Sequence, residues 1–149
     1  MGQRRMAREC ALKMLYEIEI KKVKGSQELE DVINLSREDT GEFTVQDEKS
    51  KSFMENLVRG VFKEKKYLDG CIQEHAKNWT LERISKIDKN VMRIAIYEMK
   101  HIEEIPFAVS IDEAIEISKK YGAQDSDKFI NGILDSIMKT IKLEKDAQK

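Results

Sequence analysis

The sequence is poor in the residues that interrupt regular structure. Its 149 residues include one proline, Pro106, and seven glycines, whereas β-sandwiches and barrels need many turns rich in both. No apolar run approaches the roughly 18 residues that a transmembrane helix requires. Residues 1–6 lead into charge and not into an apolar stretch, so no signal peptide is expected. These absences favour a helical, cytoplasmic protein without a membrane segment.

Groups that carry catalysis or bind metals are also scarce. Cys10 and Cys71 have no neighbouring Cys or His at metal-ligand spacing, and two cysteines do not make a disulfide framework. The two histidines, His75 and His101, lie far apart in the sequence. No glycine-rich phosphate loop and no nucleophile elbow occurs. We therefore expect no enzymatic activity, no metal and no cofactor.

The net charge of −1 conceals segments of opposite sign. Residues 1–24 carry a net +4 and residues 25–56 a net −6, while residues 57–102 carry +4 and residues 103–149 carry −3. A local positive field attracts a polyanion even when the total charge is near zero. The acidic segment 25–56 is expected to stay away from a polyanion, and it would serve solubility or attract a basic protein.

Apolar residues recur at helical spacing along almost the whole chain, which predicts an all-α fold of about seven helices. The helix expected over 89–102 is apolar nearly all round, so it should be the most buried. The expected segments and their end signals are 3–22 ended by Gly25, 27–35, 47–64 capped by Thr44 or Asp47, 66–77, a short turn from Thr80 to Ile84, 89–102 capped by Asp88, a helix from Ser110 or one turn earlier to Tyr121, and a last helix capped by Asp125 or Ser126 with the core stripe Ile130, Ile133, Leu134, Ile137 and Ile141.

Two connecting segments and three glycines complete this prediction. Residues 36–46 should form an exposed loop, and residues 144–149 a frayed charged tail after a domain of residues 1–143. Gly60, Gly70 and Gly132 fall inside expected helices, where each costs about 1 kcal/mol relative to alanine. Close approach of two helices would explain them, and a tolerated surface glycine is the alternative for each.

The first expected helix carries a basic and aromatic face. Helical spacing puts Arg5, Arg8 and Tyr16 on the side turned away from the apolar stripe, with Arg4 beside them. An arginine fork grips phosphate through two hydrogen bonds, and an aromatic ring can stack an unpaired base. This arrangement suits an RNA-binding helix. The alternative is a solvated arginine face with Tyr16 packed against a neighbour.

Polar residues crowd the expected start of the last helix, where backbone N–H groups can bind an anion or a base edge. The alternative is that Asp125 and Ser126 only cap the helix while Phe129 belongs to the core. The residues of this second candidate site are Asp125, Ser126, Asp127, Lys128, Phe129 and Asn131.

Several motifs occur in order within about residues 3–141. They are Arg8-Glu9-Cys10-Ala11 through Leu15-Tyr16, Tyr67-Leu68-Asp69-Gly70, Val91-Met92-Arg93-Ile94-Ala95-Ile96-Tyr97-Glu98, and a run from Ile105-Pro106-Phe107-Ala108 through Asp125-Ser126 and Lys128-Phe129-Ile130-Asn131-Gly132 to Asp135. With these motifs the sequence resembles the NusB family. The resemblance implies an all-helical fold of two helical subdomains and a bacterial transcription antitermination factor. Such a factor pairs with the ribosomal protein NusE and binds the boxA element of nascent single-stranded RNA, chiefly in transcripts of ribosomal RNA operons. It joins RNA polymerase together with other Nus factors.

The resemblance also implies roles for single residues. RNA contacts fall on Arg4, Arg5, Arg8, Tyr16, Asp125, Ser126, Lys128, Phe129 and Asn131. The basic N-terminus is short, and His75 stands where some relatives carry an aromatic residue near the RNA path; an imidazole stacks more weakly. Asp69, Asp88 and Arg93 are candidates for the NusE-facing surface, and each could instead be a cap or part of an internal ion pair.

Two other functions stay open on the sequence. The chain could be a helical adaptor that binds protein and no RNA. It could also resemble the RNA-docking module that occurs fused to RNA cytosine methyltransferases; catalysis would then need a partner chain, because 149 residues leave no room for a catalytic domain. Monomer and homodimer are both compatible with the sequence.

Overall fold

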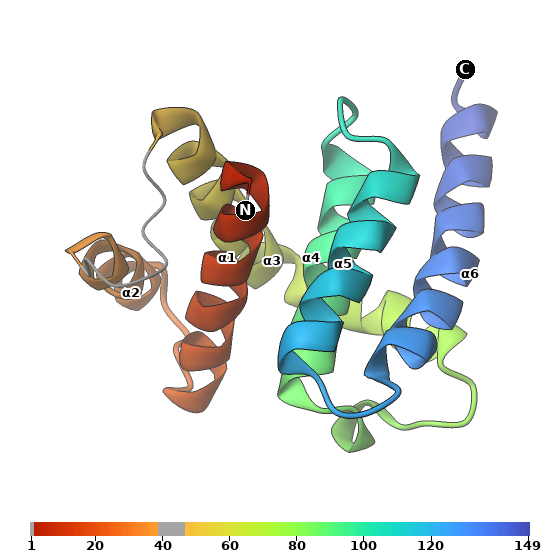
Figure 1. Cartoon of the computed structure of the whole chain (residues 1–149), viewed down its shortest axis with the longest axis horizontal. Helices are drawn as coiled ribbons and strands as arrows, with labels where there is room; N and C mark the ends of the chain where they lie inside the picture. The colour runs from red at the N-terminus through yellow and green to blue at the C-terminus, as the bar shows by residue number, and fades with distance from the viewer. Residues whose placement is uncertain (1, 39–46) are drawn as a thin grey trace. The chain divides into compact units, whose positions relative to one another are not determined.

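The structure, a computed structural model, describes residues 2–38 and 47–149, and these residues contain helices and no strand. The α-helices are α1 (Gln3–Ile20), α2 (Ser26–Glu38), α3 (Glu48–His75), α4 (Lys86–His101), α5 (Phe107–Tyr121) and α6 (Ser126–Ala147), with a 3-10 turn, η1 (Leu81–Arg83), before α4 (Figure 1). The all-α prediction is confirmed. The chain forms two compact units, Met1–Lys63 and Glu64–Lys149. No described helix is both long and apolar enough to cross a bilayer.

Helix α3 joins two segments that the sequence separated. Its backbone leaves helical geometry only at Glu64, with φ −103° and ψ 15°, so a kink stands where we expected a break between 64 and 66. The kink coincides with the division between the two units. At its start, Asp47 Oδ1 accepts a hydrogen bond from Ser50 N at 2.8 Å, which identifies Asp47 as the cap; Thr44 lies outside the described residues.

Three helix ends differ from the prediction. Helix α1 ends at Ile20, and Lys22 takes a left-handed conformation (φ 54°), so the helix ends before Gly25, the residue that we expected to end it. Helix α2 continues to Glu38, into the segment predicted as a loop, whose remaining residues lie outside the described ranges. Helix α6 continues to Ala147, so the backbone is helical where a frayed tail was expected.

The caps of α4 and α5 also differ. Ser85 precedes α4, and its Oγ accepts from Asp88 N at 3.1 Å, so the predicted cap by Asp88 is wrong. Helix α5 starts directly after Pro106, the earlier of the two expected positions. A proline suits this position because its fixed φ fits a helix start and it has no N–H to satisfy.

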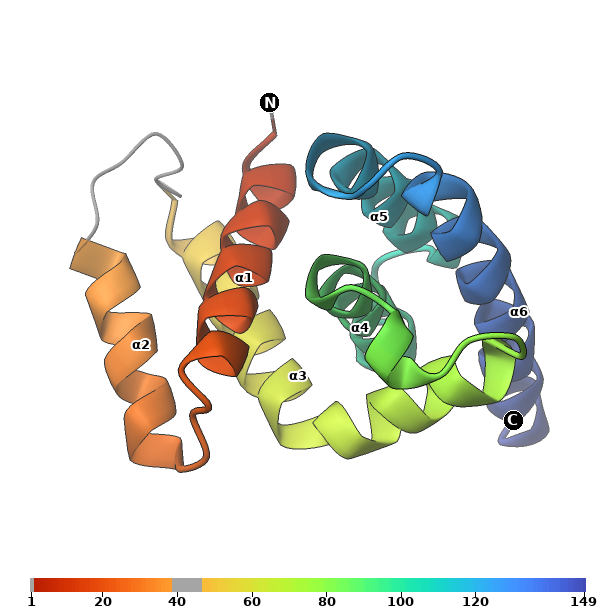
Figure 2. The same cartoon turned by 90° about the horizontal axis from the view of Figure 1, so that it is seen from below.

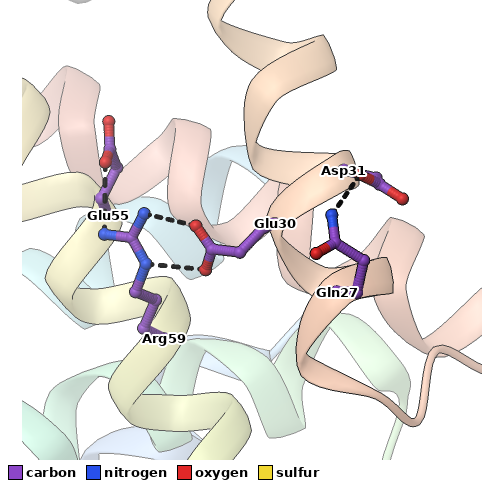
Figure 3. Close-up of polar contacts among 5 residues, drawn as sticks. All are labelled: Gln27, Glu30, Asp31, Glu55 and Arg59. Atoms are coloured by element: carbon purple, nitrogen blue, oxygen red, sulfur yellow. Dashed lines mark hydrogen bonds and ion pairs between the residues drawn. The ribbon is translucent and has the colours of Figure 1, made fainter.

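In the first unit, α1 packs against α2, and an ion pair holds α2 to α3. Arg59 on α3 donates to both carboxylate oxygens of Glu30 on α2, at 2.9 and 2.8 Å, and to Glu55 at 3.2 Å (Figure 3). Both carboxylates raise the pKa of Arg59. The apolar core of this unit consists of Ala7, Ala11, Leu12, Met14, Leu15, Ile18, Leu29, Val32, Ile33, Phe53, Met54, Leu57, Val58 and Val61.

In the second unit, α4, α5 and α6 lie side by side (Figures 1 and 2). Every residue of α4 from Asn90 to Met99 is buried, which confirms that this helix is the most enclosed of the chain's elements. The predicted core stripe of α6, from Ile130 to Ile141, is also buried. The apolar face of α6 is therefore fixed, and its other faces stay available for contacts with other molecules.

Two of the three helical glycines, Gly70 and Gly132, do not mark close helix contacts. A Cβ added at Gly70 or Gly132 would meet no atom within 4 Å, so the alternative of a surface glycine holds for both. The crowded glycine is Gly122, between α5 and α6, where a Cβ would lie 2.7 Å from Ser118 O and 3.0 Å from Ser126 Cβ.

Candidate functional site

The basic face of α1 is smaller than the sequence suggested. Arg4 is exposed and Arg5 is half-buried, but Arg8 is only 3% exposed. The expectation that Arg8 lies on the outer face is therefore wrong. The reason is the width of the buried stripe of α1, which extends past the predicted core positions to include Leu12, on the same side of the helix as Arg8.

The arginines of α1 are arranged around a ring from α3. The guanidinium carbon of Arg4 lies 4.4 Å from the centre of the Phe53 ring, and that of Arg8 lies 5.2 Å from it. A cation over an aromatic face is held by the ring quadrupole. Phe53 thus belongs to the core, as predicted, and also orients two cations. Helical spacing could not predict this second role, because Arg8 and Phe53 are 45 positions apart in the chain.

Tyr16 is 40% exposed on α1. The alternative of a tyrosine packed away against a neighbour therefore does not describe it. The first unit presents Arg4, part of Arg5 and the Tyr16 ring to solvent, which is the basic and aromatic combination that the sequence predicted, without Arg8.

The start of α6 has an unusual backbone. Asp125 takes a left-handed conformation (φ 67°, ψ 6°), and its side chain makes no capping hydrogen bond. Its carboxylate lies 3.7 Å from Lys128 Nζ, with both side chains exposed. Ser126 is 6% exposed, and its hydroxyl donates to Asp88 Oδ2 at 3.0 Å. Asp125 therefore takes the N-cap position, as predicted, but its side chain does not cap the helix, and Ser126 is the first helical residue.

Asp88 joins the start of α4 to the start of α6. It is 8% exposed, and burial raises the pKa of its carboxyl while the Ser126 and Ser85 hydrogen bonds act to lower it. Its Oδ1 has no hydrogen-bond partner. This carboxylate faces inward, so Asp88 has a structural contact where the sequence offered it as a candidate for a partner protein.

Asp69 and Arg93 form an internal ion pair, the alternative that the sequence left open. Arg93, 2% exposed, donates to the two carboxylate oxygens of Asp69 at 2.6 and 3.0 Å and to Asn90 Oδ1 at 2.9 Å. A buried guanidinium needs such partners because removing one leaves an uncompensated charge. Arg93 therefore links α3 to α4 inside the second unit.

The exposed side of α6 adjoins two aromatic groups from other elements. The Phe129 ring lies 5.9 Å from the Trp79 ring, centre to centre, at 72°. His75 Nδ1 is 2.7 Å from Ser136 Oγ, two turns further along α6. Lys128 and Asn131 are exposed on the same helix. Phe129 is half-buried, so the alternative that it belongs to the core does not describe it.

Trp79 is the residue that sequence reasoning missed. It is 47% exposed and lies against Phe129. The signal available was the chain's single tryptophan in a polar segment between two expected helices. Within the described residues, no group of three or more His, Cys, Asp or Glu side chains could hold a metal ion.

The sequence model of the NusB family matches residues 5–139. The chain belongs to the NusB family. A transcription antitermination protein NusB from Acetivibrio thermocellus is 38% identical over 146 residues, which cover 98% of this chain and 95% of that protein. Membership fits the described geometry, because the family motifs fall on the helices α1, α3, α4, α5 and α6 and on the residues directly before α5 and α6.

Solved structures of the family share the fold. A T. maritima NusB structure has a TM-score of 0.79 and 37% identity, covering 93% of this chain and 92% of that one. A crystal structure of the antitermination factors NusB and NusE in complex with double-stranded RNA has a TM-score of 0.75 at 19% identity, covering 94% of this chain and 98% of the matched chain.

Proposed function

We propose that this chain is a non-catalytic transcription antitermination factor that pairs with NusE and binds boxA-type single-stranded RNA in nascent transcripts of ribosomal RNA operons. The observation that carries the proposal is the nearly full-length similarity to a relative named as a transcription antitermination protein. The solved complex of a NusB with NusE and RNA supports both partners. In this role the protein acts in the cytoplasm, with RNA polymerase and the other Nus factors, as monomer or homodimer.

The RNA-binding part of the proposal assigns different roles to the predicted residues. Arg4 and Arg5 attract the phosphates, and the exposed Tyr16 ring offers a stacking face. Buried Arg8 acts through its contact with Phe53. This binding is an attraction between a polyanion and a local positive surface, and it does not need a positive total charge.

At α6, we propose that some residues contact the RNA and that Ser126 only holds this surface in place. Asp125, Lys128 and Asn131 are exposed, so that Asp125 and Asn131 can reach base edges and Lys128 can reach phosphates, while Phe129 and His75 offer partly exposed rings. Ser126 supports this surface from beneath through its hydrogen bond to Asp88. We place no NusE contact on Asp88 or Arg93, because both are buried and have internal partners.

The experiment is a binding measurement with purified chain, a boxA-type single-stranded RNA and NusE. We expect RNA to bind the chain alone and to bind more tightly when NusE is present. Affinity that is equal with and without NusE would contradict a cooperative pair. A pull-down from lysate, with bound RNA sequenced and bound proteins identified, tests the other functions: protein without RNA would indicate an adaptor, and ribosomal RNA with a methyltransferase would indicate a docking module.

A further inference from the structure

A glutamine side chain fixes the segment that carries Trp79. Gln73 Nε2 donates to Trp79 O at 2.9 Å, and Leu81 N donates to Gln73 Oε1 at 2.9 Å. One amide thus closes both ends of residues 79–81, and Trp79 N donates to Ala76 O at 3.2 Å. A half-exposed tryptophan on a plain loop would lose much freedom on binding a ligand. Here the backbone that carries the ring is already ordered.

The face of α6 beside this tryptophan has open space above its backbone at Gly132. Phe129, Gly132 and Ser136 are spaced at i, i+3 and i+7 and so lie on one side of the helix. Trp79 contacts the first and His75 bonds to the last. Between them, a Cβ added at Gly132 would meet nothing within 4 Å. The helix backbone is therefore uncovered between an aromatic pair and an imidazole.

We propose that Trp79, Phe129, Gly132, His75 and Ser136, here called the aromatic surface, bind an unpaired RNA base, with Trp79 as its stacking platform. The inference rests on the proposed function and adds a residue to it. Every base has a flat π face, and stacking on an aromatic side chain is the general way in which proteins hold unpaired bases. The glycine leaves room for a flat ring, and His75 and Ser136 lie at its edge with hydrogen-bonding groups.

Two lysines beside the aromatic surface favour RNA over an apolar protein segment. Lys77 is exposed two residues before Trp79, and Lys128 is exposed directly before Phe129. A lysine near each ring can meet the phosphates on either side of a stacked base. The neighbouring exposed positions Asn78, Thr80 and Asn131 are polar, whereas a groove for an apolar helix would be lined with aliphatic side chains.

Tryptophan fluorescence reports on this position alone, because Trp79 is the chain's only tryptophan. We expect a boxA-type single-stranded RNA to quench the emission of the full-length wild-type protein with the same midpoint as binding of labelled RNA. The same RNA annealed to its complement should quench much less, since its bases are paired. Trp79→Leu should weaken binding about tenfold, and Trp79→Phe, which keeps a ring, should retain most of the affinity.

A variant at Gly132 separates loss of binding from loss of folding. Gly132→Leu places a side chain on the bare part of the aromatic surface, so we expect RNA affinity to fall about tenfold, as when one stacked base is lost. The same change should raise the midpoint of thermal unfolding, because a glycine inside a helix is unfavourable. Gly70→Leu, at an equally open helical position on α3, is the matched control and should leave RNA affinity unchanged.

The outcomes distinguish this inference from the proposed function. RNA binding that proceeds without quenching, with Trp79→Leu and Gly132→Leu binding as the wild type does, would overturn the stacking role and leave the antitermination function intact. A wild-type chain that binds no RNA even with NusE would overturn both. A protein that binds the aromatic surface, with RNA excluded from it, would likewise contradict the inference.

Discussion

Single residues in this chain owe their roles to neighbours far away in the sequence. Arg8 lies over Phe53, Ser126 donates to Asp88, and Arg93 pairs with Asp69 across 24 positions. The sequence marks each of them as a polar side chain that could face a ligand. The structure buries Arg8, Ser126 and Arg93 because a partner from another helix compensates the loss of hydration. Burial of this kind cannot be derived from helical spacing alone.

The buried carboxyl group of Asp88 should make the stability of the fold depend on pH. Burial raises its pKa in the folded chain, so the fold binds this proton more tightly than the unfolded chain does. The group therefore stabilises the fold fully below its unfolded-state pKa, and this contribution is lost as the pH rises through the raised pKa. Asp88→Asn stays neutral, so its free energy of unfolding relative to wild type should increase as the pH rises above about 4, the ordinary pKa of an aspartate in an unfolded chain.

Urea unfolding at a series of pH values measures this difference. Asp112→Asn, at an exposed position of α5, is the control and should show a flat difference over the same range. A flat difference for Asp88→Asn as well would mean that the buried carboxylate is fully compensated in its charged form.

At the scale of elements, helices were easier to predict than their ends. Period and composition identified each helical segment, including the deeply buried α4. The ends were missed where two signals competed: Ser85 and Asp88 both suit a cap, and only Ser85 takes that position. The break expected between residues 64 and 66 was wrong: no proline or glycine stands there to end the helix, and the backbone only kinks at Glu64. Turn chemistry is local, but the choice between equivalent caps depends on packing.

Two glycines, Gly122 in the turn between α5 and α6 and Gly132 within α6, should respond in opposite ways to substitution by alanine. Gly122→Ala should lower the free energy of unfolding by about 1–3 kcal/mol, because its Cβ would press on the Ser118 carbonyl, Ser126 Cβ and Asp88 Oδ1. Gly132→Ala should raise it by up to about 1 kcal/mol, since it adds a methyl group in open space on a helix. Chemical denaturation of both variants checks the pair. Stabilisation by Gly122→Ala would show that this turn can widen.

At the scale of the molecule, the near-neutral total charge is divided among segments. The first 24 residues carry a net +4, and the acidic residues that follow are partly neutralised from within, since Arg59 holds Glu30 and Glu55. A field of this kind is local and is screened by salt beyond about 10 Å. RNA binding should therefore depend on a few cations at one surface and not on the total charge.

Salt dependence tests which cations these are. Arg4→Ala with Arg5→Ala should weaken binding of boxA-type RNA and reduce the slope of log K against log salt concentration by roughly 1.4, because each phosphate contact to a single strand contributes about 0.7. Lys65→Ala with Lys66→Ala removes two exposed neighbouring cations from α3 and should leave the slope unchanged. An unaltered slope in the arginine variant would remove α1 from the RNA path.

The sequence by itself determined the fold class, the segregation of charge and the family motifs, because these depend on period, composition and order along the chain. Only the tertiary structure decided which polar residues of those motifs stay accessible. It turned Arg8, Ser126 and Arg93 inward and brought Trp79 against Phe129. Accessibility depends on which helices pack together, and such pairings join residues whose spacing in the sequence carries no signal.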